Sequence, residues 1–348
     1  MVNSRRIMGY KKVIISKYGP PEVLQVIEEQ SLPEPRSEEV RVKVLVTSAA
    51  FTDTLLRKGM YPEVRKKPPL TPGYDMVGIV DRCGEGVTSL KTGQRVAAMT
   101  VYGAYTEYMC LPQESLTPVP EGLDSAEVVS LILTYMTAYQ MLHRSAKVHS
   151  GQTLLVHGAG GAVGTALLQL GKLLDLKMYG TARKSKHGLV KQLGGIPIDY
   201  QAEDFVERIK REPGGGIDAV FDCIGGDYFK RSFRVLRPGG ILVAYGFQQA
   251  IMGKGGIVDI IAGFLKLQFW NLMPNNRKAL FYSITSMRKK HPAWFNEDLV
   301  QLMELLKQRK IQPVIARKMP LTEAVQAHRL LDRSDVEGKI VLVVHEEG

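Results

Sequence analysis

The pattern of apolar and polar positions divides the chain into two regions of different texture. Up to about residue 120, short runs rich in β-branched residues, such as Val13–Ile15 and Val40–Val46, alternate with Pro and Gly clusters such as Pro72-Gly73. Near Asp124 the texture changes, and a helix start precedes a long apolar run to Leu142. We therefore expect a β-rich region first and a helical segment after it.

From Gly151 onward, short apolar runs alternate with a helix-length run, which is typical of strand–helix–strand units. Strands are predicted at Thr153–His157, from Lys177, at Ala219–Asp222 and at Ile241–Tyr245, and a helix is predicted at Thr165–Leu174. Such alternation predicts a parallel, doubly wound sheet, so the fold class is α/β. A turn at Pro238-Gly239-Gly240 should precede the last of these strands.

The C-terminal region adds one helix and one strand. Residues 297 to 310 have the pattern of an amphipathic helix, and Lys339–Val344 has that of a strand returning to the β-rich region. Because 348 residues exceed what one core usually supports, we expect two domains. The β-rich domain should comprise residues 1–127 and 290–348, and the α/β domain residues 128–289.

A glycine-rich turn follows the first strand of the α/β region. Its glycines at positions 158, 161 and 164 fit the spacing G-x-x-G-x-x-G, whereas Val163 excludes a strict G-x-G-x-x-G. The turn follows an apolar strand and opens an apolar helix, where small residues let the backbone approach a pyrophosphate at the helix N-terminus. The residues predicted to cradle the phosphates are Gly158, Ala159, Gly160, Gly161, Ala162, Val163 and Gly164.

The next strand predicts the choice of dinucleotide. NADH-binding sites place an acid at the end of this strand to hold the ribose 2′-hydroxyl. Here Gly180–Lys186 contains no acid, and Arg183 with a lysine at 184 or 186 would pair with a 2′-phosphate. Solvated charges at a helix start are the alternative. We predict NADPH, with Thr181, Ala182, Arg183 and Lys186 among its contacts.

Ligands of open α/β sheets bind at the carboxyl ends of the strands. This rule adds four candidate contacts after the third and fourth predicted strands, namely Ile224, Gly225, Gly246 and Phe247. Cys223 lies at one such end, and we interpret it as a small packed residue rather than a nucleophile.

Composition excludes several other classes. Hydrophobic residues make up 45% and charged residues 23%, which is ordinary for a globular protein. Three scattered cysteines predict neither a disulfide framework nor a C-x-x-C metal site. The N-terminus lacks the apolar segment of a secretory signal, so we expect a cytoplasmic protein. A net charge of +11 allows a phosphorylated ligand, and without a nucleic-acid-binding motif we expect no nucleic-acid partner.

Short motifs distributed along the chain resemble the medium-chain dehydrogenase/reductase superfamily from about Gly9 to Val344. They are Tyr18–Leu24, Thr71–Gly78, Gly93–Val96, Gly103–Tyr108 and Glu337–Val341. The resemblance implies a β-rich, GroES-like catalytic domain, formed from both chain ends, and a central Rossmann domain. The glycine spacing is that of the quinone oxidoreductases of this superfamily.

The resemblance also indicates a reductase without zinc. Zinc alcohol dehydrogenases of this superfamily use an early Cys and a Gly-His-Glu motif, where this sequence has Phe51 and Gly73-Tyr74-Asp75. Catalytic zinc needs about three protein ligands, so we predict no metal. Without a Lewis acid, hydride transfer to an already electrophilic quinone is favoured over alcohol oxidation. An alkenal or enone reductase, or a cofactor-bound sensor with little turnover, remains open.

By resemblance, residues 50 to 61 supply the substrate pocket, with Phe51 and Tyr61 from this stretch and Phe247 from the α/β domain. Tyr61 is the catalytic candidate, as a hydrogen-bond donor to a carbonyl oxygen, although packing in the β-rich domain is the alternative. Relatives often carry polar residues where this sequence has Ala50 and Leu55, so the pocket should be more apolar.

Four further residues are assigned by resemblance or by local pattern. Thr137 matches a threonine at the nicotinamide carboxamide, unless its hydroxyl bonds its own helix. Tyr200 matches a tyrosine near the adenosine phosphate. We interpret Asp53 as a helix cap. For Lys339 we favour a solvated side chain, and an approach to the cofactor is the alternative.

Residues 250 to 290 form an unusually apolar segment. In Ile257–Trp270 a narrow stripe of Asp259, Ala262, Gly263 and Lys266 interrupts large apolar side chains, and basic residues follow. We favour a core helix or the interface of a homodimer. The alternative is contact of residues 257–273 with a lipophilic substrate or a membrane surface.

Overall fold

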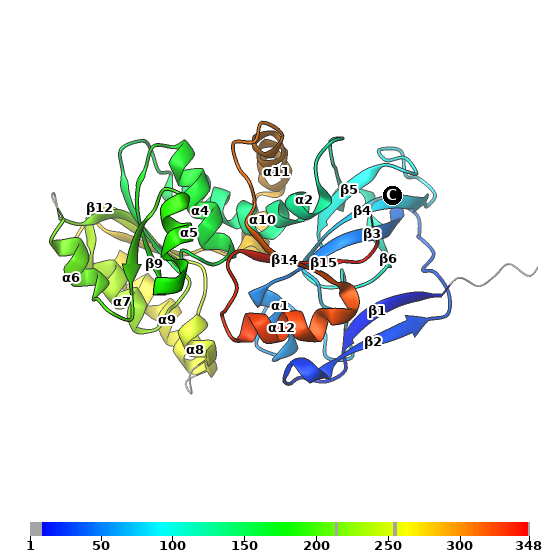
Figure 1. The fold of residues 1–348 in the computed structure, drawn as a ribbon, viewed down its shortest axis with the longest axis horizontal. Helices are drawn as coiled ribbons and strands as arrows, with labels where there is room; N and C mark the ends of the chain where they lie inside the picture. Colours follow the sequence, from blue (N-terminus) through cyan, green and yellow to red (C-terminus); the bar gives the residue numbers. More distant parts are fainter. Residues whose placement is uncertain (1–8, 213–214, 253–255, 347–348) are drawn as a thin grey trace, which may run out of the picture. The chain divides into compact units, whose positions relative to one another are not determined.

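The computed structural model describes residues 9–212, 215–252 and 256–346. The chain forms two compact units (Figure 1). The first consists of the segment up to Leu133, of Leu299–Lys307 and of the segment from Ile315; the second consists of Thr134–Asp298 and Gln308–Val314. These units divide at 133/134 and 298/299, and the domain boundaries at 127/128 and 289/290 stay a prediction. The second division lies within helix α11 (Pro292–Lys307), which contributes residues to both units.

The first unit is built on a mostly antiparallel sheet, in which only β14 and β15 pair in parallel, and both ends of the chain contribute strands to it. Its strands follow the order β14-β15-β3-β4-β5-β7, and β6 pairs with β3. Their bounds are β3 Glu39–Ala49, β4 Asp75–Cys83, β5 Arg95–Met99, β6 Tyr108–Pro112, β7 Thr117–Pro118, β14 Ile315–Pro320 and β15 Lys339–Val343. β15 pairs antiparallel with β3, which confirms that the last strand returns to the β-rich region.

A hairpin and short helices complete this unit. Strands β1 (Tyr10–Ile15) and β2 (Leu24–Glu29) pair with each other. Helices α1 (Phe51–Arg57) and α12 (Ala324–Asp332) pack together. The helical run predicted after Asp124 begins in this unit with α2 (Ser125–Ser130). A π-helical segment at Leu131–Tyr135 crosses the boundary at 133/134, and α3 (Met136–Gln140) and a second π-helical segment at Met141–Ala146 belong to the second unit.

The second unit contains the predicted parallel sheet. Its six strands follow the order β10-β9-β8-β11-β12-β13, and every adjacent pair is parallel. Their bounds are β8 Thr153–His157, β9 Lys177–Ala182, β10 Ile196–Asp199, β11 Ile217–Asp222, β12 Leu236–Ala244 and β13 Lys278–Phe281. The doubly wound α/β architecture is thereby confirmed.

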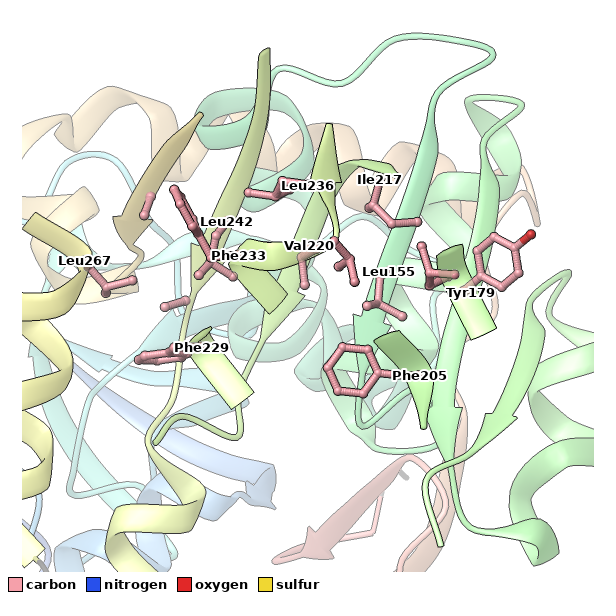
Figure 2. Close-up of a cluster of buried hydrophobic side chains, with 14 of the residues drawn as sticks. Leu155, Tyr179, Phe205, Ile217, Val220, Phe229, Phe233, Leu236, Leu242 and Leu267 are labelled. Atoms are coloured by element: carbon pink, nitrogen blue, oxygen red, sulfur yellow. The ribbon is translucent and has the colours of Figure 1, made fainter. Parts of the chain in front are cut away.

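Helices cover both faces of this sheet. Helices α4 (Ala162–Leu173) and α5 (His187–Gln192) pack on β8, β9 and β10. The opposite face carries α6 (Phe205–Lys210), α7 (Asp227–Arg234) and α9 (Gly256–Asn271). The short helix α8 (Gln248–Met252) precedes α9 in the sequence. Figure 2 shows the buried cluster beneath them, in which Phe205, Phe229 and Phe233 meet strand residues such as Leu155 and Val220.

Three local predictions differ from the structure. The glycines at 158–164 tighten the turn, so α4 begins at Ala162 rather than Thr165. Pro238-Gly239-Gly240 lies inside β12, where a register shift against β11 absorbs these residues as a bulge. The helix expected at 297–310 is α11, which starts at Pro292 because proline suits the first position of a helix.

Candidate functional site

The glycine turn of the second unit forms a cradle that side chains would fill. Gly158 follows β8 with φ of +69°, which favours glycine. A Cβ atom on Gly164 would lie 2.3 Å from the carbonyl oxygen of Gly158 and 2.6 Å from the Cα of Ala159. Gly161 is the N-cap of α4 and provides no side-chain cap, so the first-turn N–H groups of Ala162 and Val163 have no acceptor within the helix. This arrangement fits a phosphate at the N-terminus of a twelve-residue helix.

Basic and aromatic side chains surround the carboxyl end of β9, next to this turn. The Nε atom of Arg183 donates to the hydroxyl of Tyr200 over 3.1 Å, because β9 and β10 are adjacent parallel strands. The side chain of Lys186 lies across the turn, with its Cδ atom 2.7 Å from where a Cβ on Gly160 would stand. The structure therefore brings together three residues predicted from different segments.

The other strand ends are held by backbone contacts. The Oδ1 atom of Asp222 accepts from the backbone N–H of Ile224 at 2.8 Å and of Gly225 at 3.2 Å. Gly246 approaches them closely, because a Cβ there would lie 2.7 Å from the carbonyl oxygen of Cys223. These predicted contacts thus occupy one cluster of strand ends. Ala182, the last residue of β9, is buried.

Phe247 and Thr137 are both buried within the second unit. The ring of Phe247 is 6% exposed and packs against Phe229, Phe264 and Phe281 in the core of the second unit. The predicted role of this ring in a substrate pocket stays a prediction. Thr137 is buried in α3, where its side chain hydrogen-bonds Tyr282 and thereby opposes the burial that raises the tyrosine pKa.

Cys223 behaves as a packed residue rather than a nucleophile. Its thiol donates to the backbone carbonyl oxygen of His157 over 3.6 Å. Burial raises the pKa of this thiol to about 12, so the thiolate needed for nucleophilic attack does not form at neutral pH.

A buried set of polar side chains beneath the glycine turn is not apparent from the sequence pattern. His157, Thr181, Ser232 and Asp222 are all nearly inaccessible and are linked by side-chain hydrogen bonds. Only Thr181 had been singled out, and only as a cofactor contact. A polar residue ending an apolar strand, as His157 ends β8, is the signal that could have pointed to this set.

The pocket residues predicted in the first unit lie around helix α1. Half-buried Phe51 is its first residue, and Ala50 and Leu55 are buried beside it. The hydroxyl of Tyr61 lies 2.7 Å from the hydroxyl of Tyr74 and donates to the Oε2 atom of Glu63 over 3.1 Å. Burial raises the pKa of both phenols, so both keep their protons. Paired hydroxyls that keep their protons are suited to donating hydrogen bonds.

Asp53 acts as the predicted cap. Its carboxylate accepts from the backbone N–H of Ala50 at the start of α1, at 2.9 Å, and from that of Gly73, at 3.0 Å. Burial raises the pKa of Asp53 to about 7, although both backbone hydrogen bonds act in the opposite direction.

The prediction that Lys339 is solvated was wrong. Its side chain is 3% exposed, and its Nζ atom lies 3.7 Å from the Oδ2 atom of the fully buried Asp75. The error arose because β15 is an interior strand of the sheet, so its first residue is covered from both sides. A buried lysine of this kind needs a carboxylate partner, which β4 supplies.

No cluster of three or more His, Cys, Asp or Glu side chains that could hold a metal ion occurs in the part of the chain that the structure describes. Phe51 and Tyr74 stand at the two positions where zinc relatives carry ligands, and neither a phenyl ring nor a neutral phenol suits zinc. Within residues 9–212, 215–252 and 256–346, no helix has the length and apolar character needed to cross a bilayer.

The two units thus combine a GroES-like β sheet with a doubly wound sheet of the dinucleotide-binding type. A family model described as "Alcohol dehydrogenase GroES-like domain" matches residues 36–121, and one described as "Zinc-binding dehydrogenase" matches residues 195–342.

Known proteins agree with these matches. The "Synaptic vesicle membrane protein VAT-1 homolog" of Danio rerio is 30% identical over 340 residues, which cover 96% of this chain and 70% of the relative. Quinone oxidoreductase of Rattus norvegicus is 29% identical over 352 residues, which cover 99% and 100%. The crystal structure of Escherichia coli quinone oxidoreductase complexed with NADPH superposes with a TM-score of 0.85 at 26% identity, covering 96% of this chain and 100% of that one. The chain therefore belongs to the medium-chain dehydrogenase/reductase superfamily, in its zinc-independent branch.

Proposed function

We propose that the protein is an NADPH-dependent reductase that transfers hydride to a quinone without a metal. The observation that carries this proposal is the acid-free, basic end of β9, where Arg183 meets Tyr200 and Lys186 lies across the glycine turn. An acid at this place would repel a 2′-phosphate, whereas a guanidinium and an ammonium group pair with it. The quinone oxidoreductase relatives support the same assignment.

The residues present fit each part of the dinucleotide. The turn that a side chain on Gly164 would fill can take the pyrophosphate, and Arg183, Lys186 and Tyr200 can hold the adenosine 2′-phosphate. The strand-end backbone at Gly225 is left for the nicotinamide half. NADPH supplies the hydride when it is bound, so the chain has only to bind, orient and polarise.

Tyr61 is the residue that we assign to polarising the acceptor. Its hydroxyl, backed by that of Tyr74 at 2.7 Å, keeps its proton and can turn from Glu63 to a carbonyl oxygen of the acceptor. The apolar Ala50 and Leu55 beside Phe51 favour an apolar ring over a polar alcohol as the group that binds there.

The cofactor assignment is tested by removing the charges at β9. Arg183→Ala and Lys186→Ala should each weaken NADPH binding roughly ten- to hundredfold, since a hydrogen bond to a charged group contributes about 1.5–3 kcal/mol. Binding of NADH should stay within twofold. Lys191→Ala, which removes an exposed charge from the end of α5, is the matched control. Equal losses for both nucleotides, or a wild-type preference for NADH, would refute the assignment.

The acceptor is tested by steady-state NADPH oxidation with a panel of quinones and enones. Quinones should give the highest kcat/KM. A higher value for enones would assign the protein as a double-bond reductase, because a polarised carbonyl and a hydride donor serve both reactions. Tight NADPH binding without turnover of any acceptor would instead favour a cofactor-bound sensor.

The partner that we propose is a second copy of the chain, docked on α9. Seven of the thirteen large apolar side chains that are exposed among the described residues lie between Val258 and Met273. Val258, Ile261, Leu265 and Phe269 share one face of α9, and the exposed Leu272 follows the last residue of the helix. Monomeric proteins rarely expose an apolar patch of this extent. α9 contacts β13, which is an edge strand of the sheet. A second copy would therefore cover both the exposed apolar face of α9 and the open edge of the sheet.

The structure changes how the sequence of α9 is understood. Gly263, predicted in the polar stripe, faces the core, where a Cβ would lie 2.7 Å from the ring of Phe247. Trp270 stacks on Phe233 with ring centroids 4.7 Å apart, so Trp270→Ala should lower the melting temperature whatever covers the outer face.

Leu265→Ser combined with Leu272→Ser tests the outer face alone. The wild type should sediment as a dimer and this variant as a monomer, with Val300→Ser, an exposed apolar residue on α11, as the control. A monomeric wild type that pellets with vesicles of anionic phospholipid would contradict the dimer and favour a membrane surface. A cytoplasmic location stays a prediction.

A further inference from the structure

Four buried side chains form a continuous chain of hydrogen bonds beneath the glycine turn. The Oδ2 atom of Asp222 lies 2.7 Å from the hydroxyl of Ser232, which lies 3.0 Å from the Nε2 atom of His157. On the other side of the ring, Nδ1 lies 3.0 Å from the hydroxyl of Thr181. The same hydroxyl accepts from the backbone N–H of Gly158 over 3.4 Å. All four side chains are at most 2% exposed.

Chemistry gives this chain a single direction. A carboxylate can only accept, so the hydroxyl of Ser232 donates to Asp222 and accepts from Nε2–H of His157. The Nδ1 atom of the neutral ring then accepts the proton of Thr181, whose oxygen receives the N–H of Gly158. Each hydroxyl donates once and accepts once. The arrangement therefore requires the Nε2–H tautomer of His157.

The surroundings hold the imidazole neutral and in place. The rings of Phe205 and Tyr228 pack edge-to-face with the imidazole, with ring centroids 4.7 and 5.2 Å from its own centroid. Burial lowers the pKa of His157, the nearby Asp222 carboxylate acts against this effect, and Arg231 acts with it. At neutral pH the ring therefore carries one proton, as the chain requires.

The chain of hydrogen bonds is connected at both of its ends to segments that line the proposed dinucleotide site. At one end is Gly158, the first residue of the phosphate turn. At the other end is Asp222, whose second oxygen holds the N–H groups of Ile224 and Gly225. This chain of hydrogen bonds runs from Thr181 at the end of β9, through His157 at the end of β8, to Asp222 at the end of β11. Backbone pairing holds these three strands together but does not extend beyond their ends.

We propose that His157, Ser232 and Thr181 are positioning residues for the dinucleotide, and that their hydrogen bonds fix the phosphate turn relative to the strand end at 222–225. The inference rests on the proposed NADPH function. None of the three side chains has to touch the ligand, because each acts through the backbone of Gly158 or through Asp222. A dinucleotide bridges the two segments, so an error in their spacing should weaken its binding as a whole.

Ser232→Ala cuts the chain at its centre. NADPH binding, measured by fluorescence titration, should weaken about tenfold, which corresponds to about 1.4 kcal/mol. The ratio of NADPH to NADH affinity and the KM for the acceptor should stay unchanged, because the partners of the 2′-phosphate are untouched. Ser130→Ala removes a similarly buried hydroxyl, in α2, and is the matched control. A lower melting temperature with NADPH affinity within twofold of wild type would overturn the proposal.

Thr181→Val and Thr181→Ser provide a second, conservative comparison. Valine keeps the shape without the hydroxyl and should lose affinity, whereas serine should restore most of it; equal affinities would overturn the proposal. Nitrogen-15 spectra of the histidine rings of the wild type, without nucleotide, should show His157 as the Nε2–H tautomer. An Nδ1–H tautomer would contradict the chain. A wild type that binds no NADPH would refute the proposed function, while the tautomer would still report on the chain.

Discussion

Replacement of His328 by Gln should make the stability of the protein less sensitive to acid. His328 is fully buried in the first unit, where its Nδ1 atom accepts from Nε of Arg57 at 3.2 Å and its Nε2 atom faces the hydroxyl of Tyr105 at 3.3 Å. Arg57, itself buried, also pairs with Asp332 at 2.6 Å. This cluster anchors α1, the helix that begins at Phe51, to α12.

The magnitude follows from the pKa of the ring. Burial, and next the positive charge of Arg57, lower the pKa of His328 from 6.5 to about 3. Between these pH values the unfolded chain binds a proton that the folded protein does not. The part of the free energy of unfolding that depends on a neutral His328 is therefore fully present above pH 6.5 and is lost as the pH falls towards 3. Its slope approaches about 1.4 kcal/mol per pH unit well below pH 6.5, and the loss between pH 6.5 and 4.5 is roughly 2 kcal/mol.

Urea unfolding of the wild type and of His328→Gln at several pH values measures this slope. Glutamine can still accept from Arg57 but binds no proton, so the variant should lose roughly 2 kcal/mol less over this range. Carboxylates that titrate in both proteins cancel in the difference. His149→Gln, at an exposed position, should retain the wild-type slope. Parallel curves for the wild type and His328→Gln would refute the reasoning.

Three further outcomes are expected. Gly164→Ala should weaken NADPH binding by tenfold or more, because its Cβ would stand 2.3 Å from a backbone oxygen, whereas Gly188→Ala, with no atom within 4 Å, should bind normally in the same titration. Tyr61→Phe should lower kcat roughly ten- to a thousandfold with little change in the Kd for NADPH, as stopped-flow hydride transfer can show; an unchanged kcat would assign the hydroxyl to packing. Activity should survive exhaustive chelation, since Phe51 replaces a zinc ligand, and one zinc per chain in metal analysis would contradict this.

Local signals in the sequence were sufficient for the architecture of the second unit. β8 coincides with the predicted strand, because an apolar run bounded by glycines has few other uses in an α/β unit. The glycine turn was equally legible, since only small residues fit at Gly164. Arg183 and Tyr200 were predicted separately from their positions at strand ends, and the parallel pairing of β9 with β10 brings them together.

The burial of charged and polar residues inside the core could not be predicted from the sequence in the same way. Lys339 was predicted to be solvated, because a lysine in a sequence carries no sign of the carboxylate that β4 places beside it. His157 and Ser232 are 75 positions apart, and nothing in the chain between them indicates a hydrogen bond. Burial of such groups depends on partners that only folding supplies.

The sequence by itself determined which segments form helices and which form strands, through the spacing of their apolar residues. It also determined the phosphate turn and the absence of an acid after β9, since these depend on neighbouring residues and on side-chain size. The tertiary structure alone decided which polar groups meet: the pair of Lys339 with Asp75, the cluster around His328, and the chain from Gly158 to Asp222. It also decided that one face of α9 is exposed although both faces are apolar. The physical reason is that local propensity acts between neighbours, whereas burial and hydrogen-bond pairing act between segments that only the packed sheets bring together.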